Sequence, residues 1–407
     1  MDADTFVQFI EDYQYKAGDR TRTDWVQIDG RQIPQFCNEF WTSRQRQASS
    51  LHEISYRACF KPQLPRFFLE ALTEPGDSVY DPFAGRGTTV IEAGLMGRNV
   101  IANDINPLSA ILAQPRFFVP GPDEVAHRLS SIPLDTGGKA GIDLSMFYHP
   151  HTEAEIVALR RYLLVREKEE TADWVDRWIR MVATNRLTGH SSGFFSVYTL
   201  PPNQAVSPEG QVRINKKRKQ VPEYREIKPR ILRKSASLMR NLSEGERASL
   251  QAAGVKAKFL CRDARSTPEV PTESVKLTVT SPPFLDVVQY SQDNWLRCWF
   301  NGISPEEVAA ITTTNALAQW CQVMEQVFAE LFRITMPGGW VAFEVGEVRK
   351  GKIRLDENVV PLGIKAGFKC IGILVNVQEF TKTAQIWGID NNRAGTNTNR
   401  IVLFCKE

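Results

Sequence analysis

The sequence predicts an α/β fold with one doubly wound, mostly parallel sheet and a large, partly helical insertion. Short apolar strands alternate with amphipathic helices in residues 62–115 and again in 255–407, which is the pattern of βαβ units. Residues 120–250 interrupt this alternation. We therefore expect four segments: an N-terminal extension over 1–50, a first part of the sheet domain over 51–118, an insertion over 119–252 and a second part of the sheet domain over 253–407.

The first half of the predicted sheet reads as strand, turn, helix, strand and helix. Gly97 is expected to close the first of these helices, and Pro107 to start the second. A further helix, PRFFLEALT, precedes them. In chain order the other expected elements are the strand SVYDPF, the turn AGRGTT, the helix TVIEAGLMG, the strand NVIANDI and the helix PLSAILAQ.

The alternation resumes after the insertion. The expected strands are VKAKFLCRDAR, VKLTVTSPPF, WVAFEVGEV, GFKCIGILVNVQ and NRIVLFCKE. One helix, NALAQWCQVMEQVFAELFRIT, lies between the second and third of them and is expected to be capped by MPGG. Inside the insertion, residues 152–187 predict helix, whereas residues 1–50 give no clear assignment.

Composition limits the class of protein. The 42% apolar and 24% charged residues are typical of a soluble globular chain, and no apolar run approaches the length needed to span a membrane. Seven cysteines lie singly, which argues against a zinc site or a disulfide framework and fits a reducing cytosol. The first residues show no signal peptide, so we expect a cytoplasmic protein without a bound metal.

Positive charge is concentrated in residues 211–240, which hold six Arg and five Lys against two Glu, although the whole chain has a net charge of only +3. Such a segment suits a polyanionic partner. A solvated loop or helix face is an equally good reading of charge alone.

Acidic and small residues follow the predicted strands where a ligand would bind. Gly85 and Gly87 allow close approach of backbone to a ligand at a helix N-terminus, without the spacing of a phosphate loop. Asp104 ends the next strand and could accept both hydroxyls of a ribose, or cap the following helix. Asp263 ends a third strand, where it could accept from an adenine amino group. With Asp81, these residues would converge on one crevice suited to an adenosine-bearing cofactor.

The Ser-Pro-Pro-Phe stretch at 281–284 ends the strand VKLTVT. Two prolines stop a strand abruptly because proline cannot donate to the sheet ladder. The motif could be only a terminator. It could also be a rigid rim that holds a hydroxyl, a carbonyl and an aromatic ring in fixed positions.

With DPFAGRGTT, NDINP and TSPPF together, the chain resembles the S-adenosylmethionine-dependent amino-methyltransferases of DNA, over roughly residues 50–115 and 255–407. The resemblance implies the class I methyltransferase (Rossmann-like) fold and S-adenosyl-L-methionine as cofactor. The segment YRACFKPQLPRFF resembles the family element that touches the methionine part of the cofactor. The cofactor-binding residues that the resemblance implies are Phe60, Lys61, Asp81, Pro82, Phe83, Ala84, Gly85, Gly87, Thr88, Asp104, Ile105, Asp263 and Ala264.

The Ser-Pro-Pro-Phe variant is similar to that of N4-cytosine enzymes, which implies methylation of a cytosine amine. By resemblance, the Ser281 hydroxyl and the Pro282 carbonyl would accept from this amine, Pro283 would stiffen the rim and Phe284 would stack on the base. We assign no general base. A base in a duplex must be flipped out to reach such a crevice, so double-stranded DNA is the expected partner. Expected phosphate-binding residues are Lys216, Lys217, Arg218, Lys219, Arg225, Lys228, Arg230 and Arg233.

Several alternatives stay open. The same chemistry could act on N6 of adenine or on an RNA amine, and a non-catalytic nucleic-acid-binding protein could retain the scaffold. Residues 190–204 suit groove or base contacts or a packed loop, and Tyr290, Asn294 and Trp295 suit the pocket or the core. Unlike many relatives, this chain has its Gly-rich motif first and the candidate recognition region between the second and third strands. A monomer or dimer is expected, with a cognate restriction endonuclease for the same site as a further partner.

Overall fold

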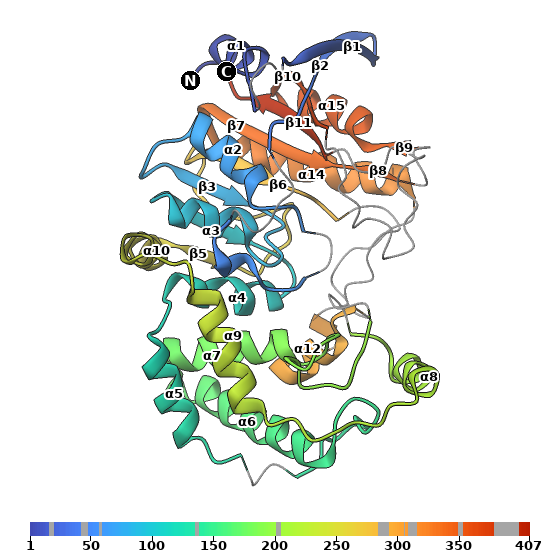
Figure 1. The fold of residues 1–407 in the computed structure, drawn as a ribbon. Coiled ribbons are helices and arrows are strands. Elements are labelled where there is room, and N and C mark those ends of the chain that lie inside the picture. Colours follow the sequence, from blue (N-terminus) through green and yellow to red (C-terminus); the bar gives the residue numbers. More distant parts are fainter. Residues whose placement is uncertain are drawn as a thin grey trace.

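The computed structural model gives an α/β protein in which one large sheet lies above a body of helices (Figure 1). The residues that the structure describes are 1–15, 20–41, 48–56, 59–134, 138–200, 205–283, 293–304, 306–307, 316–348, 353–377 and 399–407.

The described strands form a nine-stranded sheet whose order predicts where a ligand would bind. The order is β1-β2-β10-β11-β7-β6-β3-β4-β5. The chain runs outward from β3 to β4 and β5, then returns to the other side of β3 with β6 and β7, so the connections reverse direction between β3 and β6. Ligands of open α/β sheets bind at such a reversal, beyond the carboxyl ends of the strands. The strand bounds are β1 Arg22–Ile28, β2 Arg31–Asn38, β3 Ser78–Asp81, β4 Asn99–Asn103, β5 Lys258–Leu260, β6 Val275–Thr280, β7 Thr335–Val345, β10 Lys369–Asn376 and β11 Asn399–Cys405.

The predicted fold class is confirmed, because the five strands from β5 to β7 all pair in parallel. β11 runs antiparallel to β7 and to β10, and β10 pairs in parallel with β2. A separate short ladder joins β8 (Glu347–Val348) to β9 (Ile353–Arg354).

Alternating side chains divide the core between the two faces of the sheet. In β7, Trp340 and Ala342 belong to one apolar cluster, whereas Val341 and Phe343 belong to the other. This period of two is what a strand buried on both faces requires. The first face carries α2 (Gln63–Leu72), α3 (Thr88–Leu95), α4 (Leu108–Ala113) and α10 (Glu244–Lys256), and the second carries α14 (Leu317–Ile334) and α15 (Leu355–Ala366).

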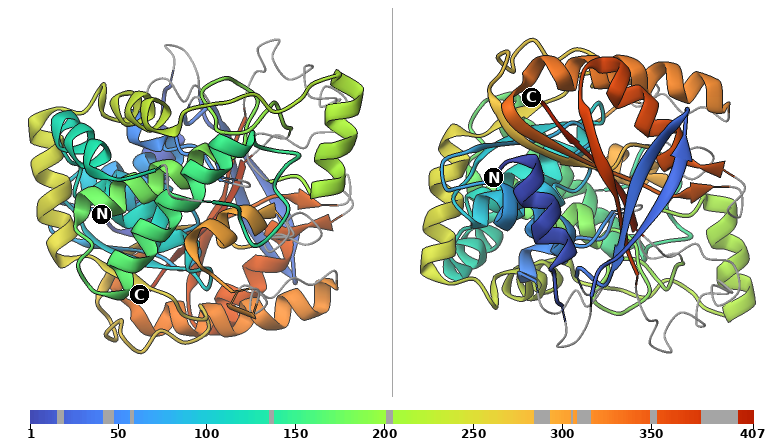
Figure 2. Two further views of the ribbon diagram at one scale, coloured as in Figure 1. Left: turned by 90° about the horizontal axis from the view of Figure 1, so that it is seen from below. Right: turned by 90° about the horizontal axis from the view of Figure 1, so that it is seen from above.

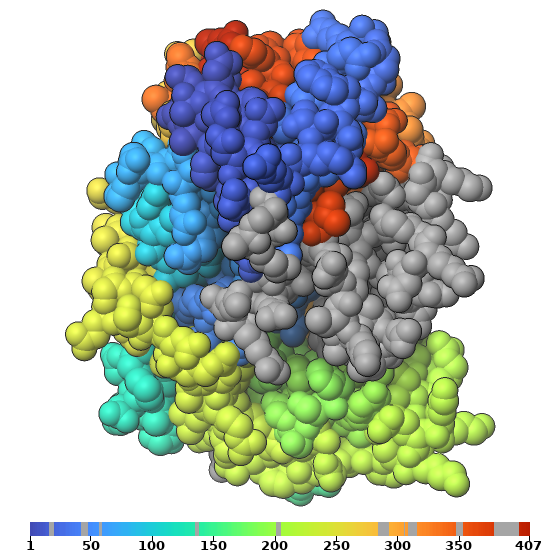
Figure 3. Space-filling model, turned by 45° about the horizontal axis from the view of Figure 1, so that its top comes forward, coloured from blue at the N-terminus to red at the C-terminus, as the bar shows by residue number. Residues whose placement is uncertain are grey.

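The N-terminal extension, which the sequence left unassigned, is part of the sheet. Helix α1 (Ala3–Glu11) packs the Phe6 ring edge-on against Trp340, at 5.0 Å between centroids. The hairpin β1–β2 turns at Asp29-Gly30, both with positive φ, and continues the sheet beyond β10. Figure 3 shows this blue segment beside the red and orange C-terminal elements.

Two further boundaries differ from the prediction. The MPGG stretch is not a helix cap: α14 ends at Ile334 and β7 begins at once with Thr335. Residues 152–187, predicted to be helical, form two helices, α6 (Pro150–Lys168) and α7 (Trp174–Arg186). Elsewhere the chain has two short 3₁₀ turns, η2 (Ser50–His52) and η3 (Gln114–Phe117). The chain turns between α6 and α7 because Glu170 has φ +56°.

The lower body of helices in Figure 1 consists mainly of the insertion. It contains α5 (Pro122–Ser131), α6, α7, α8 (Pro208–Arg218) and α9 (Ile227–Met239). Helix α12 (Trp295–Asn301) lies in this body, although it belongs to the second part of the sheet domain. It is fixed there by Arg180 of α7, which donates to the side-chain and main-chain oxygens of Asn301 at 2.8 and 2.9 Å. Conversely, α10 lies against the sheet, where Leu250 enters the core of the first face.

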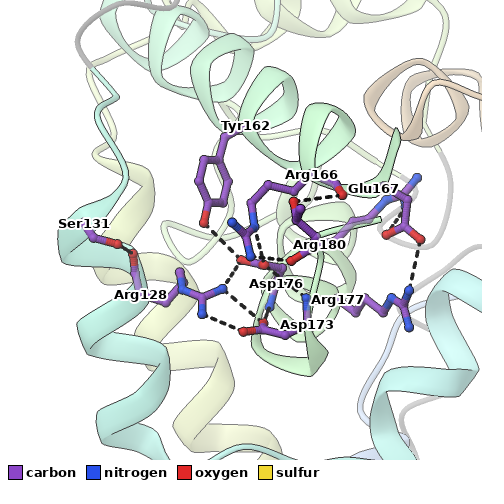
Figure 4. A network of polar contacts seen from close by, with 10 residues as sticks. Arg128, Ser131, Tyr162, Arg166, Glu167, Asp173, Asp176, Arg177 and Arg180 are labelled. Atoms are coloured by element: carbon purple, nitrogen blue, oxygen red, sulfur yellow. Dashed lines mark hydrogen bonds and ion pairs between the residues drawn. The ribbon is translucent and has the colours of Figure 1, made fainter. Parts of the chain in front are cut away.

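A buried carboxylate holds three helices of the insertion together (Figure 4). The Asp176 side chain on α7 is 1% exposed, and it accepts from Arg166 Nε of α6 at 2.7 Å and from Arg128 of α5. The Tyr162 hydroxyl of α6 donates to the same carboxylate at 3.3 Å. Asp176 also donates its main-chain N–H to Asp173 in a capping box.

We expect Asp176→Ala to lower the free energy of unfolding by about 3 kcal/mol, because it leaves two arginines without their shared buried acceptor. Urea unfolding followed by circular dichroism measures this change. Asp123→Ala, an exposed acid on α5, is the control and should change stability by less than about 0.5 kcal/mol. Equal effects of the two substitutions would contradict this role of Asp176.

Candidate functional site

The strand ends on both sides of β3 line one pocket. It lies at the carboxyl ends of β3, β4 and β5 and of β6, where the chain connections reverse. Of the residues predicted from the sequence, those that line it are Phe60, Asp81, Pro82, Phe83, Ala84, Gly85, Thr88, Asp104, Ile105, Asp263, Ala264, Ser281 and Pro283. The structure therefore brings together three motifs that lie up to 200 positions apart in the chain.

The Gly-rich turn is shaped by two glycines with different tasks. Gly85 has φ +51° and lines the pocket, where its N–H donates to Asp104 Oδ2 at 2.8 Å. Gly87 has φ +79° and is not among the pocket-lining residues. A Cβ at Gly87 would lie 2.7 Å from the Ala113 Cβ, so this glycine lets α3 approach α4.

Asp104 accepts from two main-chain N–H groups beside the pocket and does not cap α4, whose N-cap is Pro107. Its Oδ1 accepts from the Asn106 N–H at 2.9 Å and its Oδ2 from Gly85, so the carboxylate orders both turns. Burial raises the pKa of Asp104 to about 6. A carboxylate offers about four acceptor positions. Two of them thus remain for a ligand in the pocket.

Asp81 connects the pocket to the Pro-Pro motif. Its side chain is 1% exposed, and Oδ1 accepts from the Thr280 hydroxyl at 2.7 Å and from the Phe83 N–H at 3.1 Å. Burial raises the pKa of Asp81 to about 7, although the hydrogen bond from Thr280 opposes this rise. A neighbouring cation would therefore favour the charged form of this carboxyl.

Hydrogen bonds from neighbouring elements fix successive residues at the end of β6. The Thr89 hydroxyl donates to the Val279 carbonyl at 2.9 Å, one residue before the Thr280–Asp81 bond. Ser281 hydrogen-bonds the buried Glu344 carboxyl at the end of β7. Pro283 is held through its carbonyl, which accepts from the indole N–H of Trp320 at 2.9 Å.

The Glu344 side chain is itself fixed. It is 8% exposed and accepts from the Asn399 side-chain amide at 2.8 Å, while burial raises its pKa.

Pro282 is buried and does not line the pocket. The predicted stacking residue, Phe284, lies outside the described residues, as does Tyr290.

Two predicted cofactor residues have other surroundings than expected. Asp263 lines the pocket but is ion-paired with Arg265 at 2.5 Å, which lowers the pKa of the carboxyl. Lys61 is not among the pocket-lining residues, and burial lowers the pKa of its amine. Asn294 and Trp295 also lie away from the pocket lining. They belong to α12, with Trp295 packed 5.9 Å from the Phe147 ring.

Sequence reasoning missed one wall of the pocket. Residues of α14 at helical spacing line it, whereas the sequence predicted this segment only as a helix, with no role in the pocket. The missed lining residues are Tyr56, Cys59, Asn106, Arg262, Arg265, Trp320, Val323, Met324 and Val327.

A buried arginine positions the segment that carries Tyr56 and Phe60. Arg86, within the Gly-rich turn, is 6% exposed and donates to the carbonyls of His52 and Ile54 at 3.0 and 2.8 Å. Roles were predicted from the sequence for the glycines on either side of Arg86 in AGRGTT, but none for Arg86 itself.

The predicted phosphate-binding residues fall into two groups. Exposed residues at the end of α8 and on α9 are Lys216, Lys217, Arg218, Lys219 and Arg233. The other three donate to main-chain oxygens: Arg225 to Ser191, Phe194 and Ser196, Lys228 to Ile132, and Arg230 to Ser192 and Glu226. The prediction for Arg225 needs correction, because this side chain is buried under a loop.

A family model matches the N-terminal part of the chain, and curated proteins match short stretches of it. Residues 3–114 match the family model described as DNA methylase (N6_N4_Mtase). The chain is 31% identical over 112 residues to the Type II methyltransferase M.MjaII of Methanocaldococcus jannaschii, covering 27% of this chain and 21% of that protein. It is 38% identical over 72 residues to M.BsoBI of Geobacillus stearothermophilus, covering 17% and 14%. The chain thus matches about a fifth or less of these relatives' lengths.

The solved structures that match this chain have low TM-scores and low sequence identity to it. A putative DNA modification methylase from Thermus thermophilus, in complex with S-adenosyl-L-methionine, has a TM-score of 0.20 at 22% identity and covers 35% of this chain and 53% of its own. The rRNA methyltransferase aviRa from Streptomyces viridochromogenes has a TM-score of 0.35 at 12% identity, covering 88% and 90%. The sequence matches therefore carry the relationship: residues 3–114, with the Gly-rich turn and Asp104, are similar to DNA methylases.

We expect Thr280→Val to raise the pKa of Asp81 above about 7, because valine keeps the shape of the side chain but removes the hydroxyl that donates to the carboxylate. Titration of the Asp81 carboxyl carbon by NMR measures the shift. Thr278→Val on the same strand is the control, since the buried Thr278 hydroxyl has no hydrogen-bond partner among the described residues. An unchanged Asp81 titration in Thr280→Val would contradict the coupling.

Proposed function

We propose that this protein is a site-specific DNA methyltransferase that transfers a methyl group from S-adenosyl-L-methionine to the N4 amine of a flipped cytosine. The observation that carries this proposal is the single pocket in which Asp81 and Asp104 meet the Ser281-Pro-Pro rim. The similarity of residues 3–114 to DNA methylases supports it independently, because that match does not include the Pro-Pro motif.

The pocket residues fit this cofactor. S-adenosylmethionine is a sulfonium cation with a ribose diol and an adenine ring, and bound here it would supply an electrophilic methyl group. Asp81 is a buried acceptor and Asp104 a half-buried one, and both suit a cation and hydroxyl donors. Both Asp263 carboxylate oxygens accept from Arg265, through its main-chain N–H and its guanidinium, so Arg265 would have to move for Asp263 to accept from an adenine amine. Met324 and Val327 offer apolar surface for a flat ring.

The rim residues would orient the attacking amine. Although burial raises the pKa of Glu344, the hydrogen bond from Ser281 favours its charged form; donating to that carboxylate, the Ser281 hydroxyl would keep its lone pairs for the substrate amine. The Pro282 carbonyl would accept the second amine hydrogen, while Trp320 holds the adjacent Pro283 in place. Such positioning can supply about 7–11 kcal/mol of a reaction barrier. Glu344 and Trp320 therefore act as positioning residues.

The target base must leave the duplex to reach this pocket. Flipping costs a few kcal/mol, which contacts to the DNA backbone have to offset. The exposed cations Lys216, Lys217, Lys219 and Arg233 suit this task, with affinity that falls steeply as salt rises. Direct transfer needs one active site per base, so a monomer suffices. Since the matched relatives are named Type II methyltransferases, we extend the proposal to a restriction endonuclease that acts on the same site.

Mass spectrometry of nucleosides tests the reaction and the base together. The purified protein is incubated with labelled S-adenosylmethionine and either DNA or RNA. We expect labelled N4-methylcytosine from DNA. Labelled N6-methyladenine alone would overturn the cytosine assignment, and label in RNA alone would overturn DNA as the substrate. No transfer to any nucleic acid would favour a non-catalytic scaffold.

We expect Ser281→Ala to lower kcat for methyl transfer about 100-fold with little change in cofactor affinity, because alanine removes an acceptor for the amine but no contact to the cofactor. Single-turnover kinetics and calorimetric cofactor titration separate the two effects. Ser274→Ala, at the exposed start of the same β6 region, should leave both unchanged. A Ser281→Ala protein that transfers at the wild-type rate would refute the role of this hydroxyl.

Cofactor affinity should depend on pH. Asp81 and Asp104 have pKa values of about 7 and about 6, so both lose negative charge as the pH falls from 8 to 6. A cation binds better to the ionised carboxylates, and we expect S-adenosylmethionine to bind about tenfold more weakly at pH 6. Titration calorimetry at both pH values measures this. The uncharged 5′-methylthioadenosine is the matched control and should bind alike; the same dependence for both ligands would contradict the account.

A further inference from the structure

The loop over residues 188–199 is a compact, closed structure. Its two ends meet in a bridge between Gly189 and Tyr198, and the Thr199 N–H donates to the Gly189 carbonyl at 3.0 Å. Phe194, 5% exposed, packs against Gly189 inside the loop, whereas Phe195, 1% exposed, belongs to the apolar core of the protein. A Cβ at Gly189 would lie 2.4 Å from the Phe194 ring, so the loop closes tightly on itself. This is the form of an Ω-loop packed by its own side chains.

A buried cation supports the loop from inside. Arg225 is 8% exposed, and one of its guanidinium nitrogens donates to the carbonyls of Ser191 at 3.2 Å, Phe194 at 3.3 Å and Ser196. The main-chain N–H of Arg225 donates to the Thr152 hydroxyl on α6 at 2.8 Å. Burying a guanidinium is unfavourable unless its donors are satisfied, and here the loop carbonyls and the Glu223 carboxylate together satisfy them. The loop conformation and the Arg225 position therefore depend on each other.

The basic end of α8 is attached to the same loop through Tyr198. The Tyr198 carbonyl accepts from the side-chain amides of Gln211 at 3.0 Å and Gln220 at 2.9 Å. The Arg218 guanidinium lies 3.7 Å from the centroid of the Tyr198 ring. On the opposite side of the loop, Arg230 of α9 donates to the Ser192 carbonyl at 2.9 Å. The loop thus joins the basic segments of both helices into one surface.

The exposed part of this surface is polar and cationic. His190, Ser191 and Ser192 form the exposed tip of the loop. Lys216, Lys217 and Lys219 are exposed at the attached end of α8, a helix that stands apart from the other helices in Figure 2.

We propose that this surface reads the DNA target, with the tip His190–Ser192 contacting base edges and Lys216, Lys217 and Lys219 contacting phosphates. The inference rests on the proposed function and assigns recognition to particular residues. Short hydroxyl side chains can donate to or accept from any base edge, whereas cations at the phosphates position the protein without reading sequence. The support from Arg225 means that the tip is ordered before DNA binds, which reduces the entropy lost on binding.

Two sets of substitutions separate reading from positioning. The triple variant His190→Ala, Ser191→Ala, Ser192→Ala should relax the methylated motif, and discrimination against one-base variants of the wild-type site should fall tenfold or more. Lys216→Ala, Lys217→Ala, Lys219→Ala should keep the motif but weaken binding to all DNA, and the slope of log K against log salt should fall by about 3. The control is the triple variant Lys139→Ala, Lys168→Ala, Lys256→Ala, which removes the same charge from exposed sites elsewhere. It should change neither the methylated motif nor the salt dependence of DNA binding.

The motif is obtained by long-read sequencing of genomic DNA from a host that lacks amino-methylation and expresses each variant. Calorimetric cofactor titration shows that each variant retains the folded sheet domain. A tip variant that methylates the wild-type motif with unchanged discrimination would overturn this inference alone. A lysine variant with the wild-type salt dependence would overturn the phosphate contacts. A wild-type protein that methylates no DNA would overturn the proposed function and, with it, this assignment.

Discussion

The hydrogen bond from the Thr280 hydroxyl to Asp81 joins the two halves of the sheet at the place where the chain reverses direction. On one side of it, β3 and β4 present the carboxylates and the Gly-rich turn. On the other side, β6 ends in the Pro-Pro rim. Under the proposed function the rest of the site depends on this contact, because a methyl donor held by the first half would have to face a nucleophile held by the second. A shift between β3 and β6 would separate the two reactants.

Loss of contact with water changes the pKa values of Asp81 and Asp104 and has a cost in free energy. Two carboxyls in one pocket lose hydration, which raises their pKa values and disfavours the charged forms in the protein alone. A cationic ligand such as the proposed cofactor would relieve this penalty. The rim is different in kind. Its hydroxyl and carbonyl groups are neutral; Glu344 hydrogen-bonds Ser281, and the Trp320 indole donates to the carbonyl of Pro283, next to Pro282.

The sequence predicted the parallel sheet and most of the pocket because both depend on local patterns. The strand before Asp81, the glycines of the turn and the Pro-Pro terminator each carry a signal over a few residues. The Asp29-Gly30 turn between alternating apolar residues is also a hairpin signal, and the N-terminal strands could have been recognised from it. Their pairing with β10, about 340 positions away, has no local signature.

Contacts between residues far apart in the chain explain the remaining differences between the predicted and the observed structure. Nothing near Arg225 in the sequence indicates that it lies under a loop some 30 residues earlier, so a basic run alone could not separate supporting arginines from exposed ones. The helix α14 was predicted, yet only the fold shows that its apolar face also forms a wall of the pocket.

The central claim is that donor and acceptor chemistry meet at the junction of β3 and β6. A crystal structure of the protein soaked with S-adenosylmethionine tests this most directly. The account predicts the cofactor between Asp81 and Asp104, with its methyl group directed at Ser281. Cofactor bound elsewhere, or bound there with its methyl group directed away from the Pro-Pro rim, would contradict it.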